Sequence, residues 1–274
     1  MWRIALFDAA MKNTIVTTAR KTSDEMKILA ENTARKLNLK FVERKDFSAD
    51  ALKKIYGAEN ILIAKKNSLN LLTEEGELFF HPNTAHLRIK NLRQGLGDRL
   101  ITAGKISNGM KILDCTLGLG SDAIVESFAV GESGKVTALE INPVIAEIVR
   151  HGMKNFSDDN EHILKAMRRV EILTTDYLNF LKSAENNSFD VVYFDPMFRH
   201  ALKKSSGINP IRPVADNRAL TVEAVQEACR VAKNFVVMKE NSKSHEFERL
   251  SFEIADGGKY SPISFGVIDC RTKN

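Results

Sequence analysis

The chain has few cysteines and no long apolar run, and each absence argues against a class of protein. Its three cysteines, Cys115, Cys229 and Cys270, are odd in number and share no C-x-x-C spacing. They therefore favour reduced thiols over a disulfide framework or a zinc site. No run of about 18 apolar residues is present, which argues against a membrane-spanning helix. Because the N-terminus also lacks the apolar core of a signal peptide, we expect a cytoplasmic protein with no metal and no membrane partner.

Positive charge is concentrated in the first part of the chain. The whole chain of 274 residues carries a formal charge of +5. Residues 1–110 hold 19 Lys and Arg against 12 Asp and Glu, whereas residues 111–274 hold 21 against 23. A basic N-terminal region suits a polyanionic partner such as a nucleic acid, and a solvated basic surface is the alternative.

Short apolar runs alternate with helical patterns along the chain, which predicts an α/β fold with a parallel sheet. We expect a small N-terminal α/β domain over residues 1–83, a basic helical bridge over 84–110 and a Rossmann-like domain over 111–274. Because Gly95 and Gly97 interrupt the bridge, it is predicted to form two short helices. Its cations are expected to grip phosphates. Met11 precedes the first expected strand, so residues 1–10 are interpreted as an extension or an upstream start.

A glycine-rich loop follows the apolar strand that begins at Lys111. It runs Asp114-Cys115-Thr116-Leu117-Gly118-Leu119-Gly120-Ser121-Asp122-Ala123 and enters a helical pattern. Glycines allow a ligand to approach the backbone, and a helix N-terminus presents unpaired N–H groups. The next strand, residues 135–139, ends in Glu140, where an acid can hold the two hydroxyls of a ribose. These features predict an adenosine-containing cofactor and leave NAD and S-adenosylmethionine open.

The acids at these strand ends also have structural interpretations. Asp114 and Asp122 could cap main-chain amides at the loop, and Glu140 could be an ordinary strand-end acid. Asp176 follows a third strand and could cap the next helix while also meeting a cofactor. Cys115 is better explained as a small buried residue than as a nucleophile.

A second motif, Asp195-Pro196-Met197-Phe198, follows the apolar strand of residues 189–194. The carboxylate and nearby carbonyls can accept hydrogen bonds from an exocyclic NH2 group, and the Phe198 ring can stack on a base. Asp-Pro is also common turn chemistry, so the motif gains its meaning from the glycine loop upstream. Since the carboxyl ends of parallel strands meet at one sheet edge, we expect one crevice to receive Gly118, Glu140, Asp176 and Asp195.

Together these motifs resemble those of the class I S-adenosylmethionine-dependent methyltransferases. The likeness is carried by the glycine loop, by Leu139-Glu140-Ile141-Asn142-Pro143 and by Val191 to Phe198. It is closest to the bacterial small-subunit rRNA (guanine-N2)-methyltransferases and their Gram-positive relatives, and it extends from about Ile61 to Ile268. The resemblance implies a seven-stranded sheet whose last strand is antiparallel, with S-adenosyl-L-methionine as the cofactor.

The resemblance also implies roles for single residues. The cofactor is expected to contact Asp114, Thr116, Gly118, Gly120, Ser121, Asp122, Glu140, Ile141, Asp176, Tyr177 and Asp195. The catalytic residues are expected to be Asp195, Pro196 and Phe198, and the substrate-binding residues Met197, Arg199, His200, Lys203 and Lys204. This chain departs from the family at Ile141, where a basic residue is usual, and in the loop 199–204, which matches only loosely.

We therefore predict methyl transfer to an exocyclic base amine, namely guanine N2 of small-subunit rRNA. Hydrogen bonds from the amine to Asp195 would direct its lone pair and stabilise the developing charge. The base must arrive unpaired or flipped. The alternatives are a methyltransferase acting on DNA, a small molecule or a protein carboxylate; a Rossmann oxidoreductase; and a non-catalytic cofactor- or RNA-binding module. A carboxylate acceptor is disfavoured because it needs no hydrogen-bonded amine.

Overall fold

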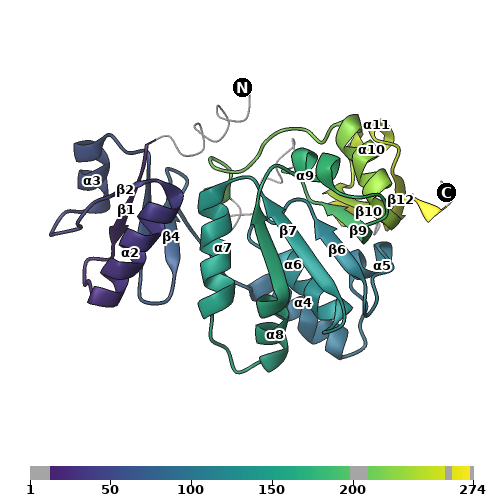
Figure 1. The fold of residues 1–274 in the computed structure, drawn as a ribbon, viewed down its shortest axis with the longest axis horizontal. Coiled ribbons are helices and arrows are strands. Elements are labelled where there is room, and N and C mark those ends of the chain that lie inside the picture. The colour runs from purple at the N-terminus through teal and green to yellow at the C-terminus, as the bar shows by residue number, and fades with distance from the viewer. Residues whose placement is uncertain (1–12, 198–208, 257–260, 272–274) are drawn as a thin grey trace. The chain divides into compact units, whose positions relative to one another are not determined.

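The chain forms two β-sheets, each in its own compact unit. The computed structural model describes residues 13–197, 209–256 and 261–271 (Figure 1). The smaller unit contains residues 13–81, 142–156 and 209–215, and the larger unit contains the other described residues. The chain therefore leaves the smaller unit and returns to it twice. Whether the expected boundaries near residues 83 and 110 separate independent folding units stays a prediction.

The smaller unit is built on a five-stranded sheet of order β2-β1-β3-β4-β5. β1 is parallel to both of its neighbours, whereas β4 is antiparallel to both of its own. Two of the helices begin at serines, Ser23 and Ser48, whose side chains accept hydrogen bonds from main-chain N–H groups and so cap the first turn. The elements of this unit are β1 (Thr14–Thr18), α2 (Asp24–Leu37), β2 (Lys40–Phe41), α3 (Ala49–Tyr56), β3 (Asn60–Ala64), β4 (Leu69–Leu72), β5 (Glu77–Phe79), α7 (Pro143–Asn155) and the 3-10 turn η1 (Asn209–Ile211).

The larger unit is built on a seven-stranded sheet of order β11-β12-β10-β9-β6-β7-β8. The five strands from β10 to β8 are parallel, while β12 is antiparallel to β10 and β11. This arrangement confirms the predicted Rossmann-like sheet with an antiparallel last strand. The strands are β6 (Lys111–Asp114), β7 (Lys135–Glu140), β8 (Val170–Thr174), β9 (Phe189–Phe194), β10 (Ala232–Asn241), β11 (Glu253–Asp256) and β12 (Ile263–Asp269).

Helices cover both faces of this sheet (Figure 1). One face carries α4 (Asn83–Arg93), α5 (Arg99–Ala103), α6 (Ser121–Val130) and α8 (Glu161–Arg169). The other carries α9 (Tyr177–Ser183), α10 (Val222–Val231) and α11 (Glu246–Arg249). The gap between α4 and α5 confirms the prediction of two short helices. In the part of the chain that the structure describes, no helix combines the length and apolar character needed to cross a membrane.

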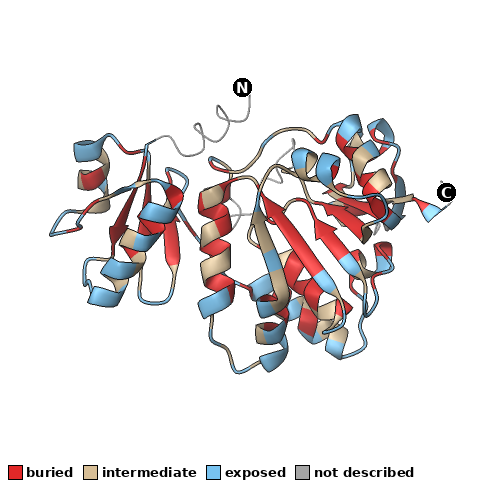
Figure 2. Ribbon diagram, viewed as in Figure 1, coloured by how far each residue is buried: buried red, intermediate tan, exposed pale blue. Residues whose placement is uncertain are grey.

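The central strands are buried on both faces, and their alternation assigns side chains to each helical layer (Figure 2). On β9, Val192 and Phe194 pack in the apolar core with α9 and α10. Because successive side chains point to opposite faces, Tyr193 faces the layer that contains α6. The side chains on this second face are more polar and build the site.

Candidate active site

The two motifs predicted to cooperate are in direct contact at the carboxyl ends of neighbouring parallel strands. β6 ends at Asp114 and β9 ends at Phe194, immediately before Asp195. The Asp195 main-chain N donates to Thr116 Oγ1 at 2.6 Å. This hydrogen bond joins the glycine loop to the Asp-Pro motif and holds the Asp195 main chain against the loop.

The glycine loop requires two left-handed residues. Gly118 has a φ of 51° and Gly120 a φ of 79°, values that favour glycine. Gly120 is the N-cap of α6. Because glycine has no side chain, it cannot accept a hydrogen bond from the main-chain N–H groups of the first turn. Gly118 N donates to Glu140 Oε2 at 3.2 Å, which links the loop to the end of β7.

Asp114 closes the first turn of the loop. Its Oδ1 accepts from Thr116 N at 2.9 Å, which is the capping role considered from the sequence. Its Oδ2 is buried and has no hydrogen-bond partner among the described residues. Burial raises the pKa of Asp114 to about 8, and the neighbouring carboxylates of Asp122 and Asp195 act in the same direction.

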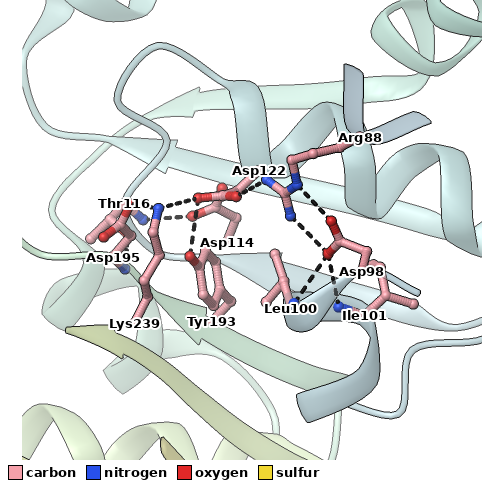
Figure 3. A network of polar contacts seen from close by, with 10 residues as sticks. All are labelled: Arg88, Asp98, Leu100, Ile101, Asp114, Thr116, Asp122, Tyr193, Asp195 and Lys239. Carbon is pink, nitrogen blue, oxygen red and sulfur yellow. Dashed lines mark hydrogen bonds and ion pairs between the residues drawn. The ribbon is translucent and has the colours of Figure 1, made fainter. Parts of the chain in front are cut away.

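Asp122, at the start of α6, is engaged by protein side chains on both of its oxygens (Figure 3). Its Oδ1 pairs with Arg88 of α4, and its Oδ2 accepts from Tyr193 Oη at 3.0 Å. Arg88 also pairs with Asp98, through Nε–Oδ2 at 2.7 Å and Nη2–Oδ1 at 2.9 Å. Arg88 therefore lies inside the fold, and the expectation that it grips a phosphate is wrong. Arg99 is likewise bound internally, to Ser261 Oγ and to the Ile263 carbonyl.

Lys239 joins Asp122 to Asp195. Its Nζ lies 2.7 Å from Asp195 Oδ2 and 3.2 Å from Asp122 Oδ2 (Figure 3). The register of β10 on β9 pairs Met238 with Phe194, the last residue of β9, and the residues that follow them, Lys239 and Asp195, lie side by side. The sequence predicted no role for Lys239, because the acids that it contacts are distant from it in the chain. The one available signal was the alternation of side chains along this strand, which places Lys239 on the same face as Val237.

Burial and charge act in opposite directions on these acids. Burial by itself would raise the pKa of Asp122, but Lys239 and Arg88 hold it below its usual range. Burial raises the pKa of Asp195, and Lys239 opposes that rise. Glu126, one turn further along α6, has two buried carboxyl oxygens with no partner among the described residues. Burial raises the pKa of Glu126 well above its usual value, so we expect it to be protonated.

A second, more exposed set of charges lies near the end of β8. Asp176 Oδ1 accepts from Asn179 N at 3.0 Å and so caps α9, as one interpretation of the sequence expected. Asp176 Oδ2 accepts from Arg218 Nη2 at 2.7 Å, and Arg218 also pairs with Asp216. The Tyr177 ring meets Phe194 edge to face with centroids 5.7 Å apart, and burial raises the Tyr177 pKa to about 12.

The other predicted site residues occupy the same strand ends or fall outside the described chain. Ser121 begins α6, Ile141 follows β7, and Pro196 and Met197 follow Asp195; all four are half-buried. Five predicted catalytic or substrate-binding residues lie outside the described residues: Phe198, Arg199, His200, Lys203 and Lys204. Within the described ranges, no group of His, Cys, Asp or Glu side chains is arranged to hold a metal ion.

The donors and acceptors at the strand ends fit an adenosine ligand that carries an amino-acid group. Glu140 is buried at the end of β7, where a carboxylate can accept from a ribose diol. The N-terminus of α6 suits a carboxylate. Asp114 Oδ2, buried and without a described partner, is an acceptor suited to an ammonium group.

Comparisons with known proteins agree with this geometry. Residues 28–259 match the model of a family described as "putative SAM-dependent methyltransferase". The chain is 37% identical over 255 residues to the uncharacterised protein YpiP of Bacillus subtilis, covering 93% of this chain and 98% of that protein. It is 28% identical over 166 residues to ribosomal RNA small subunit methyltransferase J of Dechloromonas aromatica, covering 58% of this chain and 65% of that protein.

A solved structure shares the fold. The crystal structure of a SAM-dependent methyltransferase from Neisseria gonorrhoeae matches with a TM-score of 0.60, covering 93% of this chain and 95% of that one. The sequences are 16% identical, so the likeness concerns the fold alone.

Proposed function

This chain belongs to that SAM-dependent methyltransferase family, and we propose that it methylates an exocyclic base amine, guanine N2, in small-subunit rRNA. Methyl transfer with S-adenosylmethionine as the cofactor follows from the family. The observation that carries the proposed acceptor is the position of Asp195, whose main chain is bound to the glycine loop through Thr116. A hydrogen-bond acceptor there suits an amine brought to the cofactor.

The residues proposed to hold the cofactor come from three strand ends. Glu140 would accept from the ribose hydroxyls, and the first turn of α6 would receive the cofactor carboxylate. Asp114 would accept from its ammonium group. Asp122 has both oxygens engaged by protein, so we propose that it contacts the cofactor through its main chain. Asp176 and Tyr177 would border the adenine, with the Asp176 carboxylate shared with Arg218.

When bound, the cofactor supplies a methyl group already activated by its positive sulfur. The task left to the chain is to position the acceptor nitrogen, whose lone pair is delocalised into the base. Asp195 Oδ2 is occupied by Lys239, and no described residue hydrogen-bonds Oδ1. We propose that Oδ1 accepts an N–H of the amine, which directs the lone pair and stabilises the positive charge that develops.

An RNA substrate is supported by two observations. The relative from Dechloromonas aromatica is named for its action on small-subunit rRNA, and residues 1–110 carry the positive excess of this chain. The target base must be presented unpaired or flipped. Met197, Arg199, His200, Lys203 and Lys204 remain the proposed substrate contacts, and stacking on Phe198 would contribute about 1–3 kcal/mol. Because ribosomal RNA lies in the cytoplasm of bacteria, we propose that a protein which methylates it is cytoplasmic.

The deciding experiment compares rRNA methylation in cells with and without the protein. Mass spectrometry of rRNA from a deletion strain should reveal one missing methyl group on a guanine. The wild-type gene should restore it, and the Asp195→Ala variant should not, because the variant has no acceptor for the amine. Calorimetry should show that Asp195→Ala still binds S-adenosylhomocysteine, since Glu140 and the glycine loop are intact.

A matched control is Asp190→Ala, in the same strand. Among the described residues, Asp190 accepts a hydrogen bond only from Lys111 N, at the opposite end of β9, so the Asp190→Ala variant should restore methylation fully. Assays of the purified protein with tritiated S-adenosylmethionine on rRNA, DNA and protein test the alternative acceptors. Methylation of DNA or protein but not rRNA would refute the RNA assignment. Cofactor binding without transfer to any substrate would indicate a non-catalytic module.

A further inference from the structure

We propose that Lys239 is a positioning residue for methyl transfer, which keeps the Asp195 carboxylate charged and turned so that Oδ1 faces the acceptor amine. The inference rests on the proposed role of Asp195 as the acceptor for that amine. It is carried by geometry within the larger unit alone, where α4, α6, β9 and β10 bring the charged groups together (Figure 3).

The contact between Lys239 and Asp195 is direct and largely enclosed. Lys239 Nζ lies 2.7 Å from Asp195 Oδ2, and the two side chains are 20% and 24% exposed. Lys239 extends from a strand whose preceding residues, Val237 and Met238, are buried, so the root of the side chain is fixed. An ammonium held on one oxygen leaves the other oxygen for a ligand. The contact therefore sets the orientation of the carboxylate as well as its charge.

Lys239 matters more to Asp195 than to Asp122. Asp122 has a second cation, Arg88, and also accepts from Tyr193 Oη. Among the described residues, Lys239 is the only cation within ion-pair distance of Asp195. If Lys239 lost its charge, Asp122 would keep Arg88 and Tyr193 Oη as partners, whereas Asp195 would have no paired cation among the described residues and would still lie near the Asp122 carboxylate.

The surrounding groups determine where a proton would then go. Besides Lys239, the charged groups that act on Asp195 are Asp122 on α6, which raises its pKa, and Arg88 on α4, which lowers it, and Asp114 at the end of β6 interacts with the same carboxylate. Burial and the Asp122 carboxylate both raise the pKa of Asp195, so removal of the Lys239 charge favours protonation of Asp195. A protonated carboxyl donates a hydrogen bond through one of its oxygens. A protonated Asp195 would therefore present a hydrogen-bond donor where the amine needs an acceptor.

The test separates the charge of Lys239 from its packing. Lys239→Gln keeps a hydrogen-bond donor but no charge, and Lys239→Arg keeps the charge. We expect Lys239→Gln to lower kcat about 10²-fold at neutral pH, the size associated with a misplaced reacting group. The KM for S-adenosylmethionine should not change. The acidic limb of its pH–rate profile should move to higher pH, and Lys239→Arg should restore most of the rate. Lys233→Gln is the control, because Lys233 is an exposed lysine at the start of the same strand.

A second measurement does not depend on activity. In protein labelled with ¹³C at aspartate carboxyls and saturated with S-adenosylhomocysteine, the Asp195 signal can be assigned from the spectrum of Asp195→Asn. We expect this signal to titrate at higher pH in Lys239→Gln than in the wild type or in Lys239→Arg. Equal titration in all three proteins, or equal loss of kcat in Lys239→Gln and Lys239→Arg, would overturn the inference. A wild-type protein that methylates no rRNA would overturn the proposed function instead, and the titration would still decide what Lys239 does to Asp195.

Discussion

Two groups of ion pairs lie near the strand ends of the larger sheet, and they differ mainly in how exposed their cations are. The Lys239 cluster consists of Arg88, Asp98, Asp122, Asp195 and Lys239. The Arg218 cluster consists of Asp176, Asp216 and Arg218. The two cations of the Lys239 cluster are 19% and 20% exposed, whereas Arg218 is 37% exposed.

The difference shows how the same pairing chemistry can serve two purposes. In the buried cluster every acid depends on a specific cation, because water cannot replace a lost partner. In the exposed cluster solvent can screen the charges, so Arg218 can release Asp176 at little cost. We therefore expect the Lys239 cluster to be preorganised and the Arg218 cluster to rearrange when a ligand binds at the end of β8.

The largest effect should come from removing a cation of the buried cluster. Arg88→Met leaves Asp98 and Asp122 without their shared partner and should lower the free energy of unfolding by about 3–5 kcal/mol. Chemical denaturation at neutral pH measures this loss. Arg93→Met, on the same helix, has no ion pair within the described chain and should change stability by less than about 0.5 kcal/mol. If Arg88→Met lowered the free energy of unfolding as little as Arg93→Met does, the buried ion pairs would not have the importance for stability that is proposed here.

A second effect, whose size depends on pH, is expected from the buried acid beside the cluster. Asp114 has a pKa of about 8 in the folded protein, against 3.8 in the unfolded chain. The folded state therefore binds the extra proton between about pH 4 and pH 8. The contribution of Asp114 to stability is fully present below pH 4 and is lost as the pH rises to about 8.

Asp114→Asn should remove this pH dependence, since an amide does not titrate and its oxygen can still accept from Thr116 N. The free energy of unfolding of the variant, minus that of the wild type, should increase from pH 4 to pH 8. Denaturation curves at several pH values measure the difference. Asp190→Asn is the control, and parallel curves for wild type and Asp114→Asn would contradict the assigned shift.

The smallest effect should come from the exposed cluster. Arg218→Met removes the partner of Asp176 and Asp216 but leaves the α9 cap formed by Asp176 and Asn179 N. We expect a loss of at most about 1 kcal/mol, because the pairs are screened by solvent. The measurement is the same denaturation as for Arg88→Met. Similar losses for the two arginine variants would show that burial does not separate the clusters.

The local features of the site were predictable from short stretches of sequence. Gly118 and Gly120 indicated a loop before a helix that a ligand can approach closely, and both adopt the positive φ that glycine tolerates. Ser23 and Ser48 are a second example, since each caps the first turn of the helix that follows it, α2 or α3. Each of these features depends on residues that lie within about four positions of each other in the chain. The contacts that produce the structure are equally local, which explains the agreement.

The charge pairing was not predictable in the same way. Arg88 was expected to bind phosphate, but it lies between Asp98 and Asp122. Arg218 pairs with Asp216 and with Asp176, which is 42 residues away in the chain. A sequence pattern shows the charge of each side chain. It does not identify the acid, distant in the chain, that pairs with a given arginine.

For this protein, residues close together in the chain are enough to specify the type of chemistry at the strand ends: a flexible glycine loop, Glu140 after one strand and Asp195 after another. The way those acids are charged and oriented depends on the register of β10 on β9 and on the packing of α4 against α6, which bring Lys239 and Arg88 to them. The physical reason is the separation along the chain over which each kind of interaction acts. Turn and capping preferences act over a few residues, whereas burial and ion pairing arise only after distant segments have packed together.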